Sequence, residues 1–333
     1  MNWKKIIAIA FGLLSFLLLA IVVIYFFSHD LGKNHSKHIN SLQEFEEFGT
    51  DGSYRLKTND LEFHIRVAGL KNEGQGILML HGFPESSILW QSLMEEANTI
   101  GYKVVAFDQR GYSPGARPKK ITNYHVDELV GDVLAVAEEI GFDSFHLVGH
   151  DWGSAVGWKT TMDYPERIIS WSALSVGHVG VFFDGIINNA AQKESSGYMH
   201  KLRMPILPEL MLQLFRKRLL GNLEGIWTTE QIAESNKILA ERGACTAMLN
   251  WYRAIDFSDE GIQDYKTKLV TRPTLYIWGK DDPVIAPEII PEQKKLITAP
   301  YKEIKLDCGH SVMQEKTDVV IEAILDHIKQ AEE

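Results

Sequence analysis

The sequence has few cysteines and fewer basic than acidic residues. Only two of the 333 residues are cysteines, Cys245 and Cys308, so at most one bridge can form and a disulfide-stapled scaffold is excluded. Lys and Arg number 34 against 44 Asp and Glu, which gives a formal net charge of −10. An acidic chain without a basic stripe is repelled by a phosphate backbone, so nucleic acid is not an expected partner.

Repeats and low-complexity tracts are also missing from the sequence. Hydrophobic residues make up 45% of the chain and charged residues 23%, so there is ample apolar surface for a large core and intrinsic disorder is excluded. At roughly 150 residues per domain, the length suggests two units or one large α/β domain with an insertion.

A long apolar run near the N-terminus predicts a membrane anchor over residues 1–30. Residues 6–27 carry no charge, and about 22 residues in a helix reach roughly 33 Å, enough to cross a hydrocarbon core. The alternative is a cleaved signal segment, but its apolar region is usually shorter and ends in small residues. Here the run ends in Tyr25, Phe26 and Phe27.

The orientation of this segment in a membrane is hardly decided by the flanking charges. Lys4 and Lys5 lie on one side and Lys33 and Lys37 on the other, so the positive-inside count is nearly balanced. The N-terminal amine favours a cytoplasmic N-terminus with the body of the protein on the extracytoplasmic side.

The rest of the chain reads as an α/β domain with a helical insertion. Residues 31–50 are polar and predict a stalk. Strand patterns follow at 54–57 and 61–67, and short apolar runs typical of buried parallel strands lie at 77–80, 104–107, 145–148, 274–277 and 303–306. Residues 127–140 have helical periodicity. We therefore expect a mostly parallel sheet with helices on both faces, formed by residues 51–175 and 269–333, and a helical cap over residues 176–268.

The sharpest chemical signal is a polar residue flanked by glycines between a predicted strand and a predicted helix. Asp151 has Gly149 two residues before it and Gly153 two residues after it. Small residues at these positions permit the tight strand-to-helix turn of a nucleophile elbow. Asp151 as a simple helix N-cap is the alternative.

An aspartate at this position changes the chemistry from that of a serine nucleophile. A carboxylate with an ordinary pKa near 3.9 is ionised at neutral pH and can attack without a general base. The product is an ester with an sp³ carbon, which water must then hydrolyse. The base therefore belongs to the second step.

The base and its partner are expected later in the chain. His310 follows the last predicted strand after Gly309, and an imidazole titrates near neutral pH, which suits the activation of water. The acid that orients it should follow the preceding strand, where Asp281 and Asp282 are both candidates.

At this point the sequence resembles the α/β-hydrolase-fold epoxide hydrolases, specifically the catalytic domain of the soluble type. The resemblance extends from about Tyr54 to the C-terminal helix and leaves only the anchor outside it. It rests on four motifs, which are HGFP at 81–84, GHDWG at 149–153, GKDD at 279–282 and GH at 309–310. In that family the acid is the last residue of a G-x-x-D run, which implies Asp282, with Asp281 as its solvated neighbour.

The resemblance also assigns an oxyanion hole. It implies that the backbone amides of Phe83 and Trp152 receive the negative charge that develops during ester hydrolysis. His81, Gly82 and Pro84 would form the scaffold of this loop, whereas a plain turn is the structural alternative.

Two tyrosines of the cap complete the set that the resemblance implies. Asn250-Trp251-Tyr252-Arg253 looks like the second tyrosine motif of the family, and Tyr198 lies several residues before a proline, as the first tyrosine does. Phenols with a pKa near 10 stay protonated at pH 7 and can donate a proton to the alkoxide of an opening epoxide.

The expected activity is hydrolysis of a small lipophilic epoxide to a vicinal diol, with no metal, no organic cofactor and no obligate protein partner. A haloalkane dehalogenase is one alternative, because it shares the aspartate, the histidine and a tryptophan after the nucleophile. That chemistry needs two N–H donors for the halide, and Trp251 is a candidate for the second. A non-catalytic membrane-tethered binding module or an esterase-like protein is the other alternative.

Overall fold

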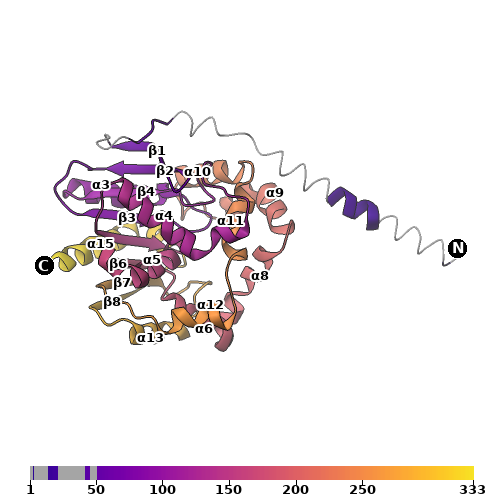
Figure 1. Ribbon diagram of the computed structural model, residues 1–333. Helices are drawn as coiled ribbons and strands as arrows, with labels where there is room; N and C mark the ends of the chain where they lie inside the picture. Colours follow the sequence, from indigo (N-terminus) through magenta and orange to yellow (C-terminus); the bar gives the residue numbers. More distant parts are fainter. Residues whose placement is uncertain (1–2, 4–13, 22–41, 46–50) are drawn as a thin grey trace.

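The computed structural model describes residue 3 and residues 14–21, 42–45 and 51–333. An eight-stranded sheet lies at the centre of the body (Figure 1). Its strands are β1 (Gly52–Thr58), β2 (Leu61–Ala68), β3 (Gly76–Leu80), β4 (Lys103–Phe107), β5 (Phe145–His150), β6 (Ile168–Leu174), β7 (Thr274–Gly279) and β8 (Tyr301–Leu306).

The sheet has the order β1-β2-β4-β3-β5-β6-β7-β8. β2 pairs antiparallel with both β1 and β4, whereas all the other neighbours are parallel. Every residue of β3, β5 and β7 is buried, because helices cover both faces of a parallel sheet. The predicted mostly parallel sheet is therefore confirmed.

One strand, β6, is absent from the sequence-based expectation. Its sequence IISWSAL interrupts the apolar run with Ser170 and Ser172, which are both fully buried. The Ser170 hydroxyl lies 2.8 Å from Nδ1 of His146 on the neighbouring strand. A hydrogen bond to that ring satisfies the serine inside the sheet, and the sequence pattern alone does not reveal such a partner.

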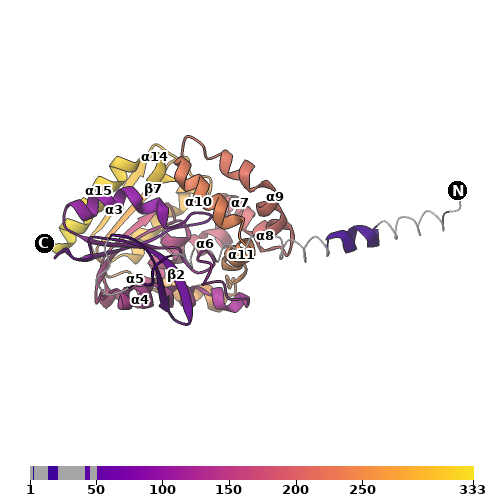
Figure 2. The same cartoon turned by 90° about the horizontal axis from the view of Figure 1, so that it is seen from above.

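Helices cover the two faces of the sheet, as Figure 2 shows from above. The core between α3, α15 and the sheet is separate from the larger core that contains α4 and α5. These elements and the two short helices beside them are α3 (Gln91–Thr99), α4 (Val126–Glu139), α5 (Trp152–Asp163), α13 (Ile290–Gln293), α14 (Val312–Glu315) and α15 (Thr317–Glu332).

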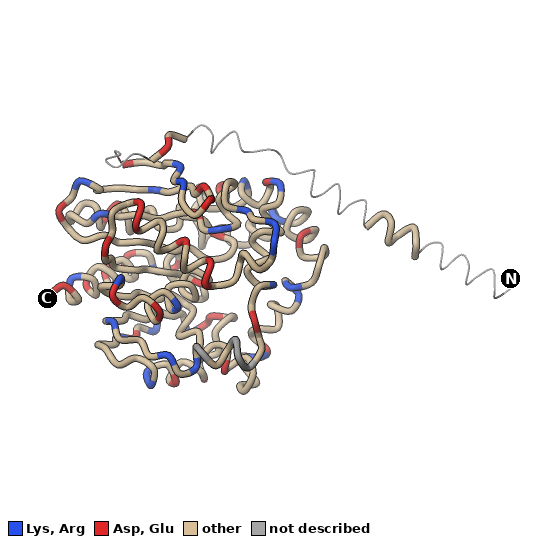
Figure 3. The backbone as a smooth tube through the Cα atoms, in the orientation of Figure 1, with Lys and Arg blue, Asp and Glu red and all other residues tan. Residues whose placement is uncertain are grey.

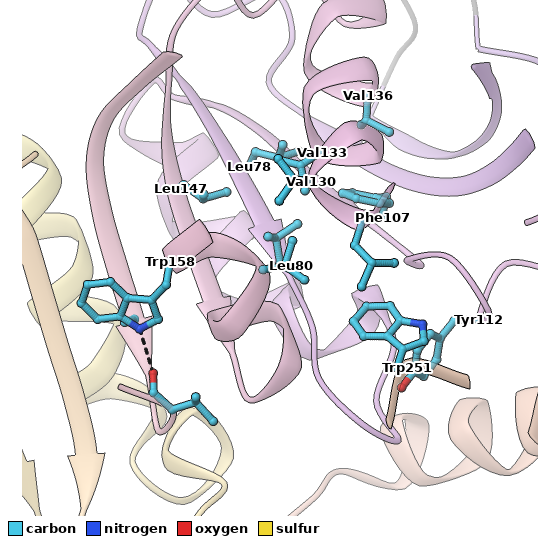
Figure 4. Packing of buried hydrophobic residues seen from close by; sticks show 14 of the residues in the cluster. Leu78, Leu80, Phe107, Tyr112, Val130, Val133, Val136, Leu147, Trp158 and Trp251 are labelled. Carbon is cyan, nitrogen blue, oxygen red and sulfur yellow. Dashed lines mark hydrogen bonds between the residues drawn. The ribbon is translucent and has the colours of Figure 1, made fainter. Parts of the chain in front are cut away.

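The packing of α4 on the sheet follows its helical periodicity. Val130 and Val133 are buried and lie beside Leu78 of β3 (Figure 4). The predicted helix over residues 127–140 is thus confirmed within one residue at each end.

Helix α5 is attached to the segment that leads into the cap. The indole N–H of Trp158 donates to the carbonyl of Val176 at 3.1 Å (Figure 4). That bond fixes α5 to the segment that leads into the cap.

All helices between β6 and β7 belong to an insertion that covers the sheet, which confirms the expected helical cap. They are α6 (Val179–Asn188), α7 (Ala190–Ser195), α8 (Gly197–Arg203), α9 (Leu207–Gly221), α10 (Thr229–Leu239), α11 (Ala244–Arg253) and α12 (Asp259–Thr267). The cap is attached to the core through Trp251, whose indole N–H donates to the carbonyl of Arg110 at 2.7 Å. Tyr112 lies against the same indole (Figure 4).

The N-terminal predictions fall mainly outside the described residues. No helix in the described ranges combines the length and apolar character that a bilayer crossing requires, and the anchor predicted for residues 1–30 remains a prediction. Within the predicted stalk, residues 42–45 are described and pair with β1. The amide of Phe45 donates to the carbonyl of Arg55 at 2.8 Å, and the amide of Arg55 donates to the carbonyl of Gln43 at 2.9 Å.

Surface charge and the two thiols agree with the composition. In the described part of the chain, Lys and Arg are interspersed with Asp and Glu (Figure 3). Cys245 and Cys308 are buried and both are free thiols.

Candidate active site

Asp151 occupies the tight turn between β5 and α5. Its backbone has φ 52° and ψ −118°, a region that residues with side chains rarely adopt and that functional sites often contain. A Cβ on Gly149 would collide with the carbonyl of Gly153, and one on Gly153 would collide with the carbonyl of Leu80. Both positions therefore require glycine, and this spacing is what the sequence pattern detects.

The loop after β3 lies directly against the Asp151 side chain. The amide N–H of Phe83 donates to Asp151 Oδ1 at 2.7 Å, and a Cβ on Gly82 would collide with the Asp151 side chain. The peptide bond between Phe83 and Pro84 is cis. Trp152 is the first residue of α5, so its amide has no acceptor within the helix and is free to meet an oxyanion.

His81 supports this loop from below. Its Nε2 accepts a hydrogen bond from the amide of Gln109 at 3.0 Å, and Gln109 donates back to the carbonyl of His81 at 2.5 Å. Burial lowers the pKa of His81, so the ring is neutral, as an accepting nitrogen requires. His81 therefore packs beneath the loop rather than facing the cavity.

His310 lies between two carboxylates. Its Nδ1 is 2.7 Å from Asp282 Oδ2, and its Nε2 is 3.3 Å from Asp151 Oδ2. The other oxygen of Asp282, Oδ1, accepts from the amide of Val284 at 2.7 Å, which holds the carboxylate towards the ring. Asp281 is exposed, so the structure brings Asp282 and not its neighbour to the histidine.

Charges within this trio shift both partners towards their ionised forms. Burial alone would raise the pKa of Asp151, but the hydrogen bond and charge of His310 outweigh it and lower that pKa. Burial likewise opposes protonation of His310, yet Asp282 and Asp151 together raise its pKa well above the usual range. Asp151 is therefore an ionised carboxylate at neutral pH, ready to attack an electrophilic carbon.

Glu85 and His150 form a second buried ion pair next to Asp151, which the sequence analysis did not identify. Glu85 Oε2 accepts from the amide of Gly82 at 2.9 Å and lies 2.8 Å from His150 Nδ1, while Gln314 donates to Oε1 at 2.8 Å. His150 Nε2 is 3.0 Å from the carbonyl of His310. Both ring nitrogens thus face acceptors, which a doubly protonated imidazolium satisfies.

The electrostatics of this pair agree with its geometry. Burial would lower the pKa of His150, but the Glu85 carboxylate outweighs it and raises that pKa. Burial would raise the pKa of Glu85, but His150 lowers it. The pair connects the loop after β3 to the loop that carries His310. The only indication of this pair in the sequence is its position: Glu85 directly follows the HGFP motif, and His150 directly precedes Asp151.

Tyr198 of α8 and Tyr252 of α11 face the nucleophile from the cap. Their ring centroids are 6.3 Å apart, and both side chains line a cavity of about 40 Å³ together with Asp151 and Trp152. Burial, with the nearby charge of Asp151, raises the pKa of both phenols. Both hydroxyls therefore stay protonated at neutral pH and remain donors.

Arg203 connects the two tyrosine helices. It ends α8, and its Nη1 donates to the carbonyl of Tyr252 at 2.6 Å and to that of Ile255 at 3.1 Å. Its guanidinium also lies 5.0 Å from the ring centre of Phe257. These contacts fix the relative position of α8 and α11, and hence of the two phenols.

A larger apolar cavity of about 530 Å³ adjoins the site. Tyr198 lines both cavities, and Phe83 lines the larger one. Its other walls are Pro84 and cap residues between positions 201 and 239, and all of these except Lys201 are apolar. The volume and lining suit an apolar molecule whose reactive end reaches Tyr198.

The two tryptophans proposed as halide donors in the dehalogenase alternative differ in their availability. Trp152 lines the cavity beside Asp151. The indole N–H of Trp251 is committed to the carbonyl of Arg110 in the core. Trp251 therefore does not supply a second donor to the nucleophile.

The described residues contain no group of three or more His, Cys, Asp or Glu side chains arranged to hold a metal ion. The site combines a carboxylate that can act as a nucleophile, an imidazole held by a second carboxylate, backbone amides near the first carboxylate and two phenol donors.

Comparisons with known proteins agree with this arrangement. A family profile described as alpha/beta hydrolase fold matches residues 76–192. Human epoxide hydrolase 4 is 30% identical over 295 residues, which cover 85% of this chain and 80% of that protein. Epoxide hydrolase 3 of Xenopus tropicalis is 28% identical over 294 residues, covering 85% and 78%.

Solved structures show the same likeness. The structure of a Bacillus megaterium epoxide hydrolase in complex with an inhibitor matches with a TM-score of 0.74 and 26% sequence identity. The match covers 83% of this chain and 99% of that one. With the sheet, the cap and the carboxylate elbow in place, the chain belongs to the epoxide hydrolase-like family of the α/β-hydrolase fold.

Proposed function

We propose that the protein hydrolyses an apolar epoxide to a vicinal diol through an ester on Asp151. The observation that carries this proposal is the convergence of three groups on one cavity. A carboxylate of lowered pKa and two phenols of raised pKa line it together. A nucleophile opposite two proton donors is what ring opening of an epoxide requires.

In the first step, Asp151 Oδ2 forms a bond to one ring carbon while the bond from that carbon to the epoxide oxygen breaks. Oδ1 is held by the amide of Phe83, so it becomes the carbonyl oxygen of the ester and Oδ2 is the attacking atom. Tyr198 and Tyr252 bind the epoxide oxygen, and one of them transfers its proton to the alkoxide. The His310 imidazolium, whose pKa falls once the charge of Asp151 is lost in the ester, gives up its proton to restore that phenol and is left neutral.

In the second step, water hydrolyses the ester. His310 Nε2 takes a proton from water, and the water oxygen bonds to the ester carbonyl carbon. The amides of Phe83 and Trp152 receive the charge that develops on Oδ1. The acyl carbon–oxygen bond then breaks, and the leaving alkoxide takes the proton that the attacking water had kept. Asp151 is again a carboxylate, and the diol leaves with the former Oδ2 of Asp151. Asp282 keeps the imidazole in the orientation and tautomer that this step needs.

The apolar cavity supports a lipophilic substrate. Its walls offer few polar partners, so a polar epoxide would lose hydration there without gaining hydrogen bonds. Haloalkane dehalogenation is less well supported, because the Trp251 indole bonds to Arg110.

We propose further that residues 1–30 anchor the protein in a membrane with the body on the extracytoplasmic side. The support is the uncharged run at residues 6–27, which has the length of a membrane-spanning helix. Protease digestion of sealed vesicles tests the orientation, because an extracytoplasmic body would be cleaved only from that side.

The decisive experiment is a single turnover in ¹⁸O-labelled water with the full-length enzyme in excess over styrene oxide. We expect an unlabelled diol from the first turnover and ¹⁸O in the peptide that contains Asp151, both read by mass spectrometry. Asp151→Asn should give no diol, whereas Asp281→Asn, a matched change at an exposed carboxylate, should behave like the wild type.

Two outcomes would contradict the proposal. Labelled diol in the first turnover would show direct attack of water on the epoxide without an ester. Bromide release from a bromoalkane by an enzyme that leaves the epoxide untouched would instead establish dehalogenation.

A further inference from the structure

Helix α9 of the cap turns its apolar side to the solvent. Figures 1 and 2 place α9 at the rim of the cap, away from the sheet. Five large apolar side chains recur along it at spacings of four, three, one and four residues, which is one face of a helix. Leu214 is 71% exposed. The five are Leu207, Met211, Leu214, Phe215 and Leu219, all of them exposed.

The inner side of the same helix contains a charge. Glu209 is buried and forms an ion pair with Arg253 of α11 at 2.7 Å. A surface helix of a soluble protein normally buries its apolar stripe and exposes its charges. α9 buries Leu212 and Leu220 beside Glu209 and still exposes a second apolar side, which indicates that an apolar partner covers its outer side.

Two cations accompany this surface. Lys217 and Arg218 are exposed on α9, whereas the one acidic residue of the helix, Glu209, is buried. The five apolar residues together with Lys217 and Arg218 are called the α9 face below. In a chain of net charge −10, a local surface that is apolar and basic is complementary to an anionic lipid surface.

The α9 face is continuous with the apolar cavity beneath it. Leu207, Met211 and Leu219 belong to the α9 face and also line the cavity of about 530 Å³ that contains Tyr198. The apolar environment therefore extends from the surface of the cap inwards, as expected if the partner outside is itself apolar.

The N-terminal part of the chain joins the body on the cap side. Leu42 lines a cavity with Lys237 and Ile238 of α10, and α10 packs on α9. The apolar run ends at Phe27, and the 14 residues from there to Leu42 span at most about 50 Å when fully extended. A bilayer that holds this run is thus within reach of the cap.

We infer that the α9 face docks on an anionic lipid bilayer, with its apolar side chains in the headgroup region and Lys217 and Arg218 on lipid phosphates. This docking is independent of the epoxide chemistry. It also differs from the proposed anchor, since a tether alone would leave the cap in water.

The test places an environment-sensitive fluorophore on the α9 face of the full-length chain. Leu214→Cys is labelled with bimane and reconstituted into phosphatidylcholine vesicles with and without phosphatidylglycerol. The quencher is a phosphatidylcholine with a doxyl group on its acyl chain. The matched control is Val319→Cys on α15, an exposed apolar position of the core. Unmutated chain treated with bimane corrects for Cys245 and Cys308.

We expect loss of bimane fluorescence at position 214 and none at position 319, with the larger loss in vesicles that contain phosphatidylglycerol. Lys217→Glu combined with Arg218→Glu should reduce the quenching at 214. The same double change at Lys294 and Lys295, an exposed basic pair near α13, should leave it unaltered.

Three results would overturn the inference. If the protein floats with vesicles but its bimane fluorescence is quenched no more at position 214 than at position 319, it is held by its anchor alone. Chain that does not float with either vesicle has neither attachment. A blue shift of the bimane emission at position 214 that grows with protein concentration and needs no lipid would show that a second copy covers the α9 face.

Discussion

At the scale of single residues, the His310 imidazole owes its high pKa to two carboxylates, and the proposed reaction consumes one of them. Asp151 and Asp282 both raise the pKa of His310. Once Asp151 is an ester it carries no charge, so its contribution disappears and the pKa of His310 falls. The imidazole therefore becomes an effective base only after the ester has formed, which is when water must be activated.

This order of events predicts that loss of His310 traps the ester. In His310→Gln the attack by Asp151 should still occur, whereas turnover should fall by about 10²–10⁴-fold, the usual contribution of a general base. Intact-protein mass spectrometry after mixing with epoxide should show a stable adduct of the substrate's mass. Asp281→Asn, a change in the loop beside Asp282, should neither slow turnover nor accumulate adduct. Absence of adduct in the glutamine variant would mean that His310 acts before ester formation.

The residues that the sequence identified share a local signature, and those that it missed do not. Asp151 lies between Gly149 and Gly153, where a Cβ would collide with backbone atoms, and His310 directly follows Gly309. Such spacing can be recognised in a single sequence. Glu85 and His150 form a pair between residues 65 positions apart. A lone charged residue gives no sign that it will be buried against another, because only the fold brings the two together.

At the scale of elements, the two phenols depend on a contact between α8 and α11. Arg203 is the residue that supplies it, through two backbone carbonyls. Hydrogen bonds from a charged donor contribute about 1.5–3 kcal/mol each at most. Their loss should let the ends of the helices separate, which moves the tyrosines relative to Asp151.

We therefore expect Arg203→Met to lower kcat/KM for an epoxide by at least about tenfold, which corresponds to roughly 1.4 kcal/mol of transition-state stabilisation. The aliphatic stem of methionine keeps much of the packing. Lys193→Met, at an exposed position of the neighbouring cap helix α7 that lines neither cavity, is the control and should leave kcat/KM unchanged. Steady-state kinetics with both variants measures kcat/KM, and equal values for the two variants would show that Arg203 does not position the tyrosines.

Element prediction from the sequence succeeded where burial has one simple pattern. The strands β3, β5 and β7 are buried at every position, and the apolar run within each was recognised. β6 was missed because Ser170 and Ser172 interrupt its apolar run, and only the fold shows that His146 bonds to the buried Ser170. The outward apolar side of α9 is invisible to periodicity alone, because a helical pattern does not say which side faces the core.

At the scale of the whole molecule, stability should depend on pH through histidines that fold in their neutral form. Burial lowers the pKa of His178 from 6.5 to about 4, and that of His327 likewise to about 4. Between pH 6.5 and 4 the unfolded chain binds protons that the folded chain does not, so acidification favours unfolding. Each histidine can remove up to about 3 kcal/mol over this range, and above pH 6.5 the effect vanishes.

The contribution of His178 is measurable against an asparagine variant. His178 Nδ1 accepts from the amide of Gly180 at 3.2 Å at the start of α6, and asparagine is a good substitute in such a cap. Denaturant unfolding at pH 7 and pH 5 should show a loss for the wild type that exceeds the loss for His178→Asn by roughly 2 kcal/mol. Parallel losses in the two proteins would mean that His178 is not the proton acceptor.

The chain leaves the sheet for the cap after β6 and returns at β7, and these two strands are hydrogen-bonded neighbours. The cap therefore departs and rejoins at adjoining points, like a cassette between two fixed ends. Its helices can lengthen, shorten or be exchanged without altering the register of any strand. Asp151, Asp282 and His310 all lie outside the cassette, whereas the two tyrosines and the α9 face lie inside it. If both proposals hold, substrate range and membrane contact can thus diversify together while the proposed hydrolytic residues stay constant.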